Sequence, residues 1–403
     1  MRSAQIVFLV LLVLYFHPTS TTLQDPHPFP SEGPWFEGWY TRLVDQTNGH
    51  SFAIINALML DQNQKNNGYL AILHATNDTS KSMEVLESFP QFPNITDCQS
   101  NPVTKKPDLF SPPCFKWVAG GCKNSYKGSP TDCEGYILSN QASTVFEFTN
   151  YANQSDGTVK GVSLKLNMGS ITPWDDSGLG PMGIAADIPK LGLYWYVYSL
   201  GTKTQYEYTT FDINQNGETT VREKLSGSAL AHQEKNWGGT FPRAWIWAQG
   251  VSQDGNVHFA LAGGPKALPV VDVEPVLWLV GYRSPQVGSW DFNPQHIDQV
   301  FTPSIDACNG HFVLTISGLL RKIVINIQAQ PSTFNDCLYG PSADGFSPMC
   351  LESFTANATI TAYERFGLSW DLIETQTLPL SALEFGGEYT CKPCSSSIKN
   401  RSF

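Results

Sequence analysis

Residues Val162 to Met168 read VSLKLNM, and apolar and polar side chains alternate along the whole of this stretch. Such alternation is typical of a strand that buries one face and exposes the other. The segments Thr144 to Thr149 (TVFEFT) and Asn357 to Tyr363 (NATITAY) alternate in the same way, and Val276 to Tyr282 (VLWLVGY) is an apolar run of strand length. Period-two patterning dominates the chain and predicts an all-β protein.

The strand pattern of the rest of the chain predicts the architecture. Two apolar runs, Phe312 to Ile316 and Ile323 to Ile327, are joined through Ser317 and Gly318, which predicts a hairpin. Short helices are expected only at Ser80 to Leu86 and Pro294 to Phe301. Many short strands separated by turns indicate two tandem β-barrel or sandwich domains. We place them at residues 23–240 and 241–395, with a disulfide-tied insertion at about residues 90–135 and a tail at 396–403.

The composition agrees with a turn-rich β protein and excludes several classes of partner. Among 403 residues, 33 are Gly and 27 are Pro, 12% are aromatic and 15% are charged, which argues against disorder and coiled coils. With 25 Lys and Arg against 36 Asp and Glu, the formal net charge is −11. The chain therefore lacks the basic surface by which proteins bind nucleic acid or an anionic membrane.

The first residues have the layout of a secretory signal peptide. Arg2 precedes an unbroken apolar run from Ile6 to Phe16, and small polar residues follow up to Thr22. The run is shorter than the roughly 18–20 residues of a spanning helix, so we predict a cleaved signal peptide over residues 1–22, with an uncleaved signal anchor as the alternative. No later stretch reaches spanning length. We expect a mature protein that is secreted or lumenal and has no transmembrane segment.

Sequons and cysteines agree with that compartment. N-x-S/T sequons, the acceptor sites of N-glycosylation, occur at Asn77, Asn94, Asn153, Asn357 and Asn400. Nine cysteines predict disulfides in an oxidising lumen, and because nine is odd, one thiol should stay free or pair between chains. Cys391 and Cys394 form a C-x-x-C, compatible with a redox pair or half a zinc site, but a structural disulfide role is favoured.

Two aromatic clusters carry the functional information. In the first, Gly33 to Tyr40 (GPWFEGWY), Glu37 stands among four aromatic residues. Burial there would favour the neutral carboxylic acid, which can donate a proton, whereas the structural alternative is a carboxylate that accepts hydrogen bonds at the rim of a sheet. The second cluster, His232 to Trp247 (HQEKNWGGTFPRAWIW), places an acid, a cation and an amide beside three tryptophans. A surface loop with a solvated ion pair is the alternative there.

These segments resemble the tocopherol cyclase family. Phe36 to Tyr40 (FEGWY) resembles the opening motif of that family, and Glu234 to Gln249 (EKNWGGTFPRAWIWAQ) resembles its EKNWG…FPRKWFWVQ stretch. Leu261 to Gly264 with Leu268 and Pro269, Cys337 to Gly340, and Tyr363 to Arg365 are similar to later family segments, in family order from about residue 30 to residue 387. A weaker likeness connects the family with carotenoid hydratases.

The resemblance implies a pair of lipocalin-like β domains and chemistry without a cofactor or metal. Tocopherol cyclases protonate the trisubstituted alkene of a prenylated hydroquinone, and the phenol oxygen then closes on the tertiary cation to form a chromanol ring. Such chemistry suits a desolvated carboxylic acid surrounded by aromatic faces, which attract a cation by about 0.5–2 kcal/mol each. A long isoprenoid tail requires an apolar cleft.

The expected site follows from this resemblance. Glu234 is the first candidate for the general acid and Glu37 the second. Lys235 and Asn236 would orient the quinol oxygens, and Arg243 would hold the loop or the head group. The residues expected to line the cation pocket are Trp39, Tyr40, Trp237, Trp245 and Trp247.

The predicted compartment departs from that of the family and leaves other functions open. The resembled enzymes work at plastid membranes, whereas this chain has a predicted secretory signal, sequons and additional cysteines. A secreted lipid- or isoprenoid-binding protein without catalysis is therefore the alternative function, and a cyclase or isomerase of another polyprenyl or polyketide metabolite is a third. Plastid delivery through a bipartite leader is the alternative location. The oligomeric state is not predicted.

Overall fold

The computed structural model describes residues 26–28, 30–81, 83–90, 94–97, 115–120, 132–139, 144–153, 157–188, 191–267 and 273–394. The predicted signal peptide over residues 1–22 and the predicted tail at 396–403 lie outside these ranges. Cys98, Cys114 and Cys122 also lie outside them, so the expected disulfides of the insertion are not described.

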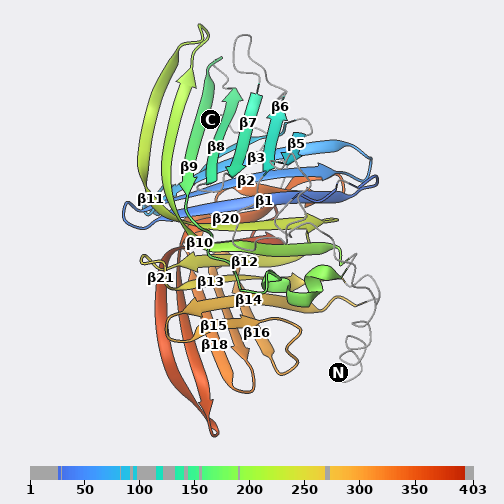
Figure 1. Ribbon diagram of the computed structural model, residues 1–403, viewed down its shortest axis with the longest axis vertical. Helices are drawn as coiled ribbons and strands as arrows, with labels where there is room; N and C mark the ends of the chain where they lie inside the picture. The colour runs from blue at the N-terminus through green and yellow to red at the C-terminus, as the bar shows by residue number, and fades with distance from the viewer. Residues whose placement is uncertain are drawn as a thin grey trace.

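The described strands form two antiparallel sheets, of 11 and 10 strands, that follow one another along the chain (Figure 1). The first sheet has the order β4-β3-β2-β1-β11-β10-β9-β8-β7-β6-β5, and the second has the order β15-β14-β13-β12-β21-β20-β18-β17-β16, with β19 paired to β20. The chain passes from one sheet to the other between Gly238 and Ala244. The all-β fold predicted from the sequence is confirmed.

The bounds of the elements are as follows. The first sheet contains β1 (Trp35–Asp45), β2 (His50–Leu60), β3 (Asn66–Thr76), β4 (Glu84–Ser88), β5 (Asn94–Asp97), β6 (Phe115–Gly120), β7 (Asp132–Ser139), β8 (Thr144–Asn153), β9 (Val159–Met168), β10 (Leu193–Ile213) and β11 (Thr219–Gly238). The second contains β12 (Ala244–Val251), β13 (His258–Pro265), β14 (Val276–Ser284), β15 (Gly288–Phe292), β16 (Val300–Asp306), β17 (His311–Ser317), β18 (Arg321–Gln328), β19 (Cys337–Ser342), β20 (Gly345–Phe366) and β21 (Ser369–Gly387). Short 3-10 turns are η2 (Gly180–Asp187), η3 (Ala307–Asn309) and η4 (Pro331–Thr333).

Most local predictions agree with these strands, and two do not. The expected hairpin is the antiparallel pair β17 and β18, and the alternating VSLKLNM segment lies in β9. The helices expected at Ser80 to Leu86 and Pro294 to Phe301 are wrong: β4 pairs with β3 over Glu84–Ser88, and β16 begins at Val300. Pairing with β3 overrides the weak helical pattern of the first segment, whereas residues 294–299 of the second form turns before β16. Part of the expected insertion also joins the first sheet as β5, β6 and β7.

Each sheet has its own apolar core, and a third cluster joins the two sheets. Trp39, Phe52 and Tyr208 belong to the core of the first sheet, whereas Trp278 and Ile325 belong to that of the second. The third cluster combines residues of both sheets, among them Trp195, Trp245, Trp247 and Phe354. Because the two sheets share this buried cluster, the domain boundary at residue 240 stays a prediction.

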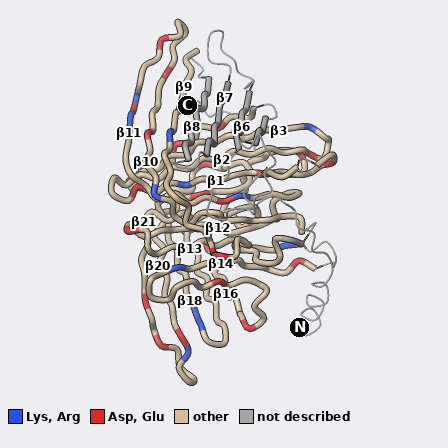
Figure 2. Tube along the Cα trace, in the orientation of Figure 1, with Lys and Arg blue, Asp and Glu red and all other residues tan. Residues whose placement is uncertain are grey.

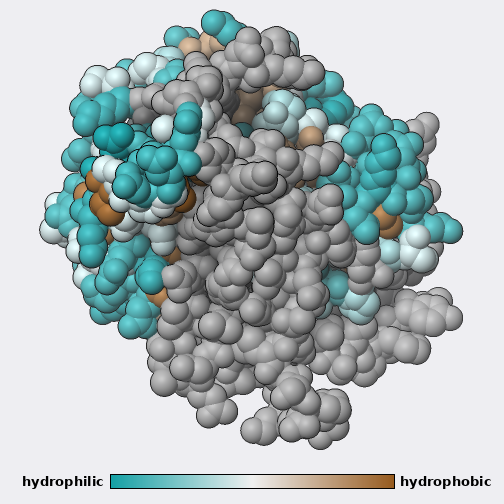
Figure 3. Space-filling view, turned by 90° about the horizontal axis from the view of Figure 1, so that it is seen from above, coloured by the Kyte–Doolittle hydropathy of each residue, from teal (hydrophilic) through white to brown (hydrophobic). Residues whose placement is uncertain are grey.

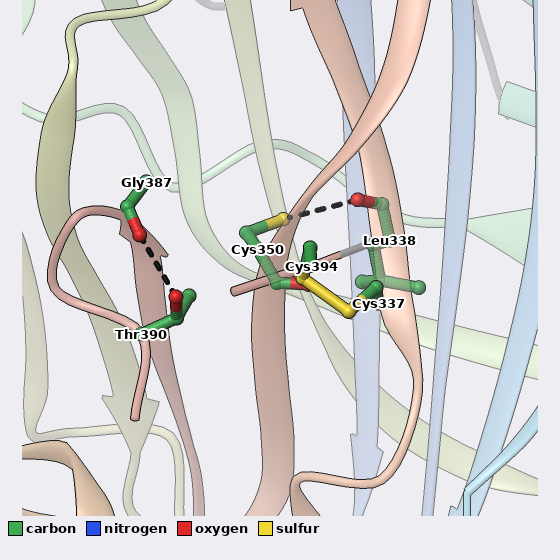
Figure 4. The surroundings of a disulfide bond; sticks show 6 residues. All are labelled: Cys337, Leu338, Cys350, Gly387, Thr390 and Cys394. Carbon is green, nitrogen blue, oxygen red and sulfur yellow. Dashed lines mark hydrogen bonds between the residues drawn. A yellow bond between two sulfur atoms is a disulfide. The ribbon is translucent and has the colours of Figure 1, made fainter. Parts of the chain in front are cut away.

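Two disulfides fasten the chain after β21 to the second sheet. Cys391 pairs with Cys308 and Cys394 pairs with Cys337, so the two cysteines of the C-x-x-C do not pair with each other. Figure 4 shows the second of these bonds beside Cys350, a buried free thiol. Such bonds persist in oxidising compartments and indicate a location outside the cytosol.

The described surface is polar and mixed in charge. Lys and Arg alternate with Asp and Glu along the outer strands and turns (Figure 2). The described part of the face in Figure 3 is mostly hydrophilic, with small hydrophobic spots. Within the described ranges, no helix has the length and apolar character needed to cross a membrane.

Candidate active site

The two aromatic motifs are neighbours in space because their strands pair. Strand β1 lies antiparallel to β11, and Tyr40 stands opposite Glu234 while Glu37 stands opposite Trp237. Successive side chains on a strand point to opposite faces. Each motif is therefore divided between two environments: one face belongs to the core of the first sheet, and the other faces the second sheet.

A cavity of about 270 Å³ lies where the two sheets meet. Its lining is mainly apolar and aromatic and comes from both sheets and from η2, as expected of a site for a hydrophobic small molecule. Of the residues that the sequence predicts for the site, the lining includes Trp39, Tyr40, Glu234, Asn236, Trp245 and Trp247.

Glu234 is held in the cavity wall by nitrogen-bearing side chains on three sides. Trp247 Nε1 donates to its Oε2 at 3.0 Å, Asn236 Nδ2 donates to its Oε1 at 3.3 Å, and His232 Nε2 lies 3.0 Å from Oε2. Glu234 is only 3% exposed. This arrangement suits a carboxylate, which accepts hydrogen bonds and donates none.

Aromatic rings form the wall around this carboxyl group. Tyr40 and Trp247 meet edge to face with ring centroids 5.1 Å apart, across the junction of the two sheets. Trp245 lies flat against β21 because Gly386 stands opposite it: a Cβ added at Gly386 would lie 1.9 Å from the indole. The glycine therefore makes room for a tryptophan in the lining.

Glu37 and Lys235 lie on the other face of the same two strands. Lys235 Nζ is 2.5 Å from Glu37 Oε1, and His27 Nδ1 is 2.7 Å from the same oxygen. Lys235 also lies 5.3 Å from the ring centre of Trp39 and 5.1 Å from that of Trp237. Burial raises the pKa of Glu37, but Lys235 and His27 together outweigh burial, so this pKa is lowered below its usual value of 4.5.

Four of the predicted site residues are thus absent from the cavity lining: Glu37, Lys235, Trp237 and Arg243. Arg243 is half exposed and forms ion pairs with Glu274 and Glu388. These pairs connect the start of β12 with the segments before β14 and after β21, so Arg243 holds loops together at the edge of the second sheet.

Two further carboxyl groups, Glu352 and Glu384, lie at the site and were not predicted from the sequence. Glu352 on β20 stands directly opposite Glu384 on β21, and Glu384 stands opposite Trp247 on β12. Glu384 lines the cavity and accepts a hydrogen bond from Trp245 Nε1. Glu352 is 1% exposed and accepts from the hydroxyl of Tyr40 at 2.9 Å. The sequence signal was a single Glu inside each apolar strand, CLESF and ALEFG.

The environment favours the protonated form of both of these acids. Burial raises the pKa of Glu384 to about 7, and the negative charge of Glu234 acts in the same direction. Burial and then the charge of Glu384 raise the pKa of Glu352 well above its usual range. Carboxyl groups that face each other in an apolar interior cannot all ionise, because each charge raises the pKa of the others.

One cation is buried beside this group of acids. Arg42 is fully buried, and its Nη2 donates to the carbonyl oxygens of Phe354 at 3.3 Å and Leu380 at 2.6 Å. Burial lowers the pKa of Arg42 to about 10, so the guanidinium stays charged at neutral pH. No group of three or more metal-binding side chains with a suitable arrangement occurs in the part of the chain that the structure describes.

The sequence is similar to known tocopherol cyclases over its second half. The profile of the family described as tocopherol cyclase-like matches residues 209–387. The chloroplastic tocopherol cyclase of Zea mays is 28% identical over 170 residues, and the probable chloroplastic tocopherol cyclase of Oryza sativa subsp. japonica is 28% identical over 178 residues. Each match covers 40% of this chain and 34% of the relative, so the chain spans about a third of the length of the curated relatives it matches.

Solved structures show a looser likeness over most of the chain. Kievitone hydratase from Nectria haematococca has a TM-score of 0.41 at 14% identity, covering 92% of this chain and 94% of that one. The protein CghA has a TM-score of 0.47 at 10% identity, covering 92% and 97%. The profile match includes the Glu234 to Gln249 motif and ends before the tail, whereas the Phe36 to Tyr40 motif lies outside it. Over residues 209–387 the chain is thus similar in sequence to the tocopherol cyclase family, and this region includes the Glu234 to Gln249 motif.

Proposed function

We propose that this protein is a cyclase-type enzyme that closes a chromanol ring on a prenylated hydroquinone by protonating its alkene. The observation that carries the proposal is the presence of two carboxyl groups, the buried Glu234 and the half-buried Glu384, in the wall of an apolar, tryptophan-lined cavity. The similarity to proteins named tocopherol cyclase supports the same reaction class.

The geometry suits each stage of this reaction. A carboxyl group of the cavity transfers its proton to the less substituted alkene carbon, and the tertiary cation that forms lies among Tyr40, Trp245 and Trp247. The faces of these rings attract the cation and offer no base that would remove a proton from it. The phenol oxygen then bonds to the cationic carbon and loses its proton to a carboxylate, so no proton is consumed overall.

The polar groups of the cavity would orient the head group. Asn236 lines the cavity and carries an amide that can bond to a quinol oxygen. The volume of about 270 Å³ is at the lower end of ligand pockets, so it suits the aromatic head and the reacting isoprene unit. The rest of a long prenyl tail would extend out of the cavity.

The proposal is tested by incubating the purified protein with a prenylated hydroquinone and separating the products by chromatography. The wild type should form the chromanol, and Glu234→Gln should lose most of this activity. Glu374→Gln is the control, because Glu374 is also a buried strand carboxyl that accepts a hydrogen bond, from the hydroxyl of Tyr282, but it does not line the cavity. An inactive wild type would refute the proposed function.

A binding protein without catalysis is the second candidate, and the predominantly apolar lining favours it. A carrier needs only that lining, whereas a cyclase also needs an acid that reaches the ligand. Saturable retention of the quinol by the wild type and by Glu234→Gln, with no chromanol from either protein, would establish the carrier.

A further inference from the structure

Three carboxyl groups meet at the wall of the cavity, and they come from three different strands. Glu234 lies on β11, Glu352 on β20 and Glu384 on β21. Trp247 connects them, since it donates to Glu234 and stands opposite Glu384, which in turn stands opposite Glu352. Glu234 and Glu384 line the cavity, and Glu352 lies behind them.

The charges of this group do not balance when all three acids are ionised. Like charges directly opposite each other on paired strands destabilise a sheet. Arg42 is the buried guanidinium beside them, and its Nη2 donates to two backbone carbonyls. Glu352 Oε2 is buried and has no hydrogen-bond partner, a costly position for an ionised oxygen. The group must therefore hold at least one proton at neutral pH.

The partners of the two cavity carboxyls differ. Glu234 is surrounded by Trp247 Nε1, Asn236 Nδ2 and His232 Nε2, a set that suits the ionised form. Glu384 accepts from Trp245 Nε1 and interacts with the thiol of Cys350, and it is partly exposed to the cavity. The proton is thus better placed on Glu384 than on Glu234.

We propose that Glu384 is the proton donor of the cavity, that Glu234 stays ionised and stabilises the cation, and that Glu352 is a buried acid that holds its own proton behind them. This assignment rests on the proposed function. It moves the general acid from the residue that the sequence favours to one on a different sheet.

Each proton is accounted for in this assignment. The O–H bond of Glu384 breaks as a C–H bond forms at the alkene, which leaves a carboxylate at Glu384 and a tertiary cation in the cavity. Glu234 is then a second negative charge near that cation. As the phenol oxygen bonds to the cationic carbon, the phenol O–H bond breaks and its proton returns to Glu384.

The pH dependence follows from the groups that face Glu384. These are Glu234 on β11, and Cys350 and Glu352 on β20, while Trp245 on β12 donates to it. A general acid works only while protonated, and the pKa of Glu384 is raised to about 7. Turnover should therefore fall as pH rises through about 7.

The experiment compares Glu384→Gln, Glu234→Gln and Glu352→Gln with the control Glu374→Gln. Glu384→Gln keeps an oxygen acceptor for Trp245 and should lower kcat about 10²–10⁴-fold while quinol binding is retained. Residual turnover of Glu234→Gln should show its alkaline limb at lower pH than the wild type, because a neighbouring negative charge is gone. Glu374→Gln should keep the wild-type profile.

An infrared pH titration of the unliganded protein gives a readout that does not depend on turnover. The wild type should show a carboxyl group that loses its proton near pH 7, and this signal should vanish in Glu384→Gln and persist in Glu234→Gln. Full turnover by Glu384→Gln would overturn the assignment. A signal that is lost in Glu234→Gln but kept in Glu384→Gln would overturn it as well. An inactive wild type that still shows the signal would refute the proposed function and leave the protonated Glu384 standing.

Discussion

Lys235 is predicted to stabilise the fold rather than to bind substrate, and Lys235→Met tests this directly. Its ammonium group is fully buried and lies 2.5 Å from Glu37, whose side chain is 1% exposed. At an effective dielectric constant of 20, this contact corresponds to about 6–7 kcal/mol of attraction. Desolvation of two ions costs several kcal/mol each and offsets most of it, so the pair contributes little net stability.

Removing one member of the pair destabilises the protein strongly, because the other charge stays buried without its partner. Lys235→Met should therefore lower the free energy of unfolding by about 3–5 kcal/mol. His27 remains as a hydrogen-bond partner of the Glu37 carboxylate, which places the expected loss at the lower end of this range. The double variant Lys235→Met with Glu37→Gln should recover most of the loss, since no unpaired charge is left.

The assay is urea unfolding with disulfides intact, followed by tryptophan fluorescence and repeated between pH 3 and pH 8. The pKa of Glu37 is lowered in the folded protein, so the fold favours the ionised carboxylate above the usual value of 4.5, and this small contribution is lost as pH falls through the folded pKa. The difference between wild type and Lys235→Met should thus narrow in acid. A variant of unchanged stability that no longer retains quinol would refute this reasoning and assign Lys235 to the ligand.

Three further predictions concern the cavity and the second sheet. Trp247→Phe removes the indole donor to Glu234 and should lower kcat about 10–100-fold, as expected for the loss of a hydrogen bond to a charged group. The control Trp290→Phe, in the core of the second sheet, should leave kcat unchanged, and equal losses in the two variants would contradict the role of the indole. Burial raises the pKa of the Cys350 thiol well above its usual value of 9.0, so alkylation at pH 8 should be slow in the native protein and fast in urea, and equal rates would show that the thiol is accessible. Replacing Cys308 and Cys391 by Ser should lower the free energy of unfolding by about 2–5 kcal/mol, because their disulfide closes a loop of 83 residues. An unchanged melting temperature would contradict this disulfide.

The alternation of apolar and polar residues within single segments was enough to predict many of the strands. VSLKLNM alternates because one face of β9 is buried and the other is not, and the run from Phe312 to Ile327 contains both strands of its hairpin. The helices expected at Ser80 to Leu86 and Pro294 to Phe301 are wrong, because the first segment pairs with β3 and the second forms mostly turns.

The candidate site was accessible to sequence reasoning only in part. Glu234 and Tyr40 stand out because a polar group among aromatic residues is unusual, and their strands are indeed paired. Glu37 and Lys235 have the same local signal, yet they belong to the opposite face. Alternation alone separates the two sets, but it does not say which set faces a cavity.

Sequence by itself thus determined the all-β class, several strands and one hairpin, and the similarity to tocopherol cyclases over residues 209–387, since these depend on local periodicity and on motifs. Tertiary structure decided where the acids meet. Glu352 and Glu384 lie opposite each other because of the register between β20 and β21, and Glu384 approaches Glu234 because the two sheets pack face to face. The register joins residues 32 positions apart and the sheet packing brings together residues 150 positions apart, and the alternation within a single strand records neither.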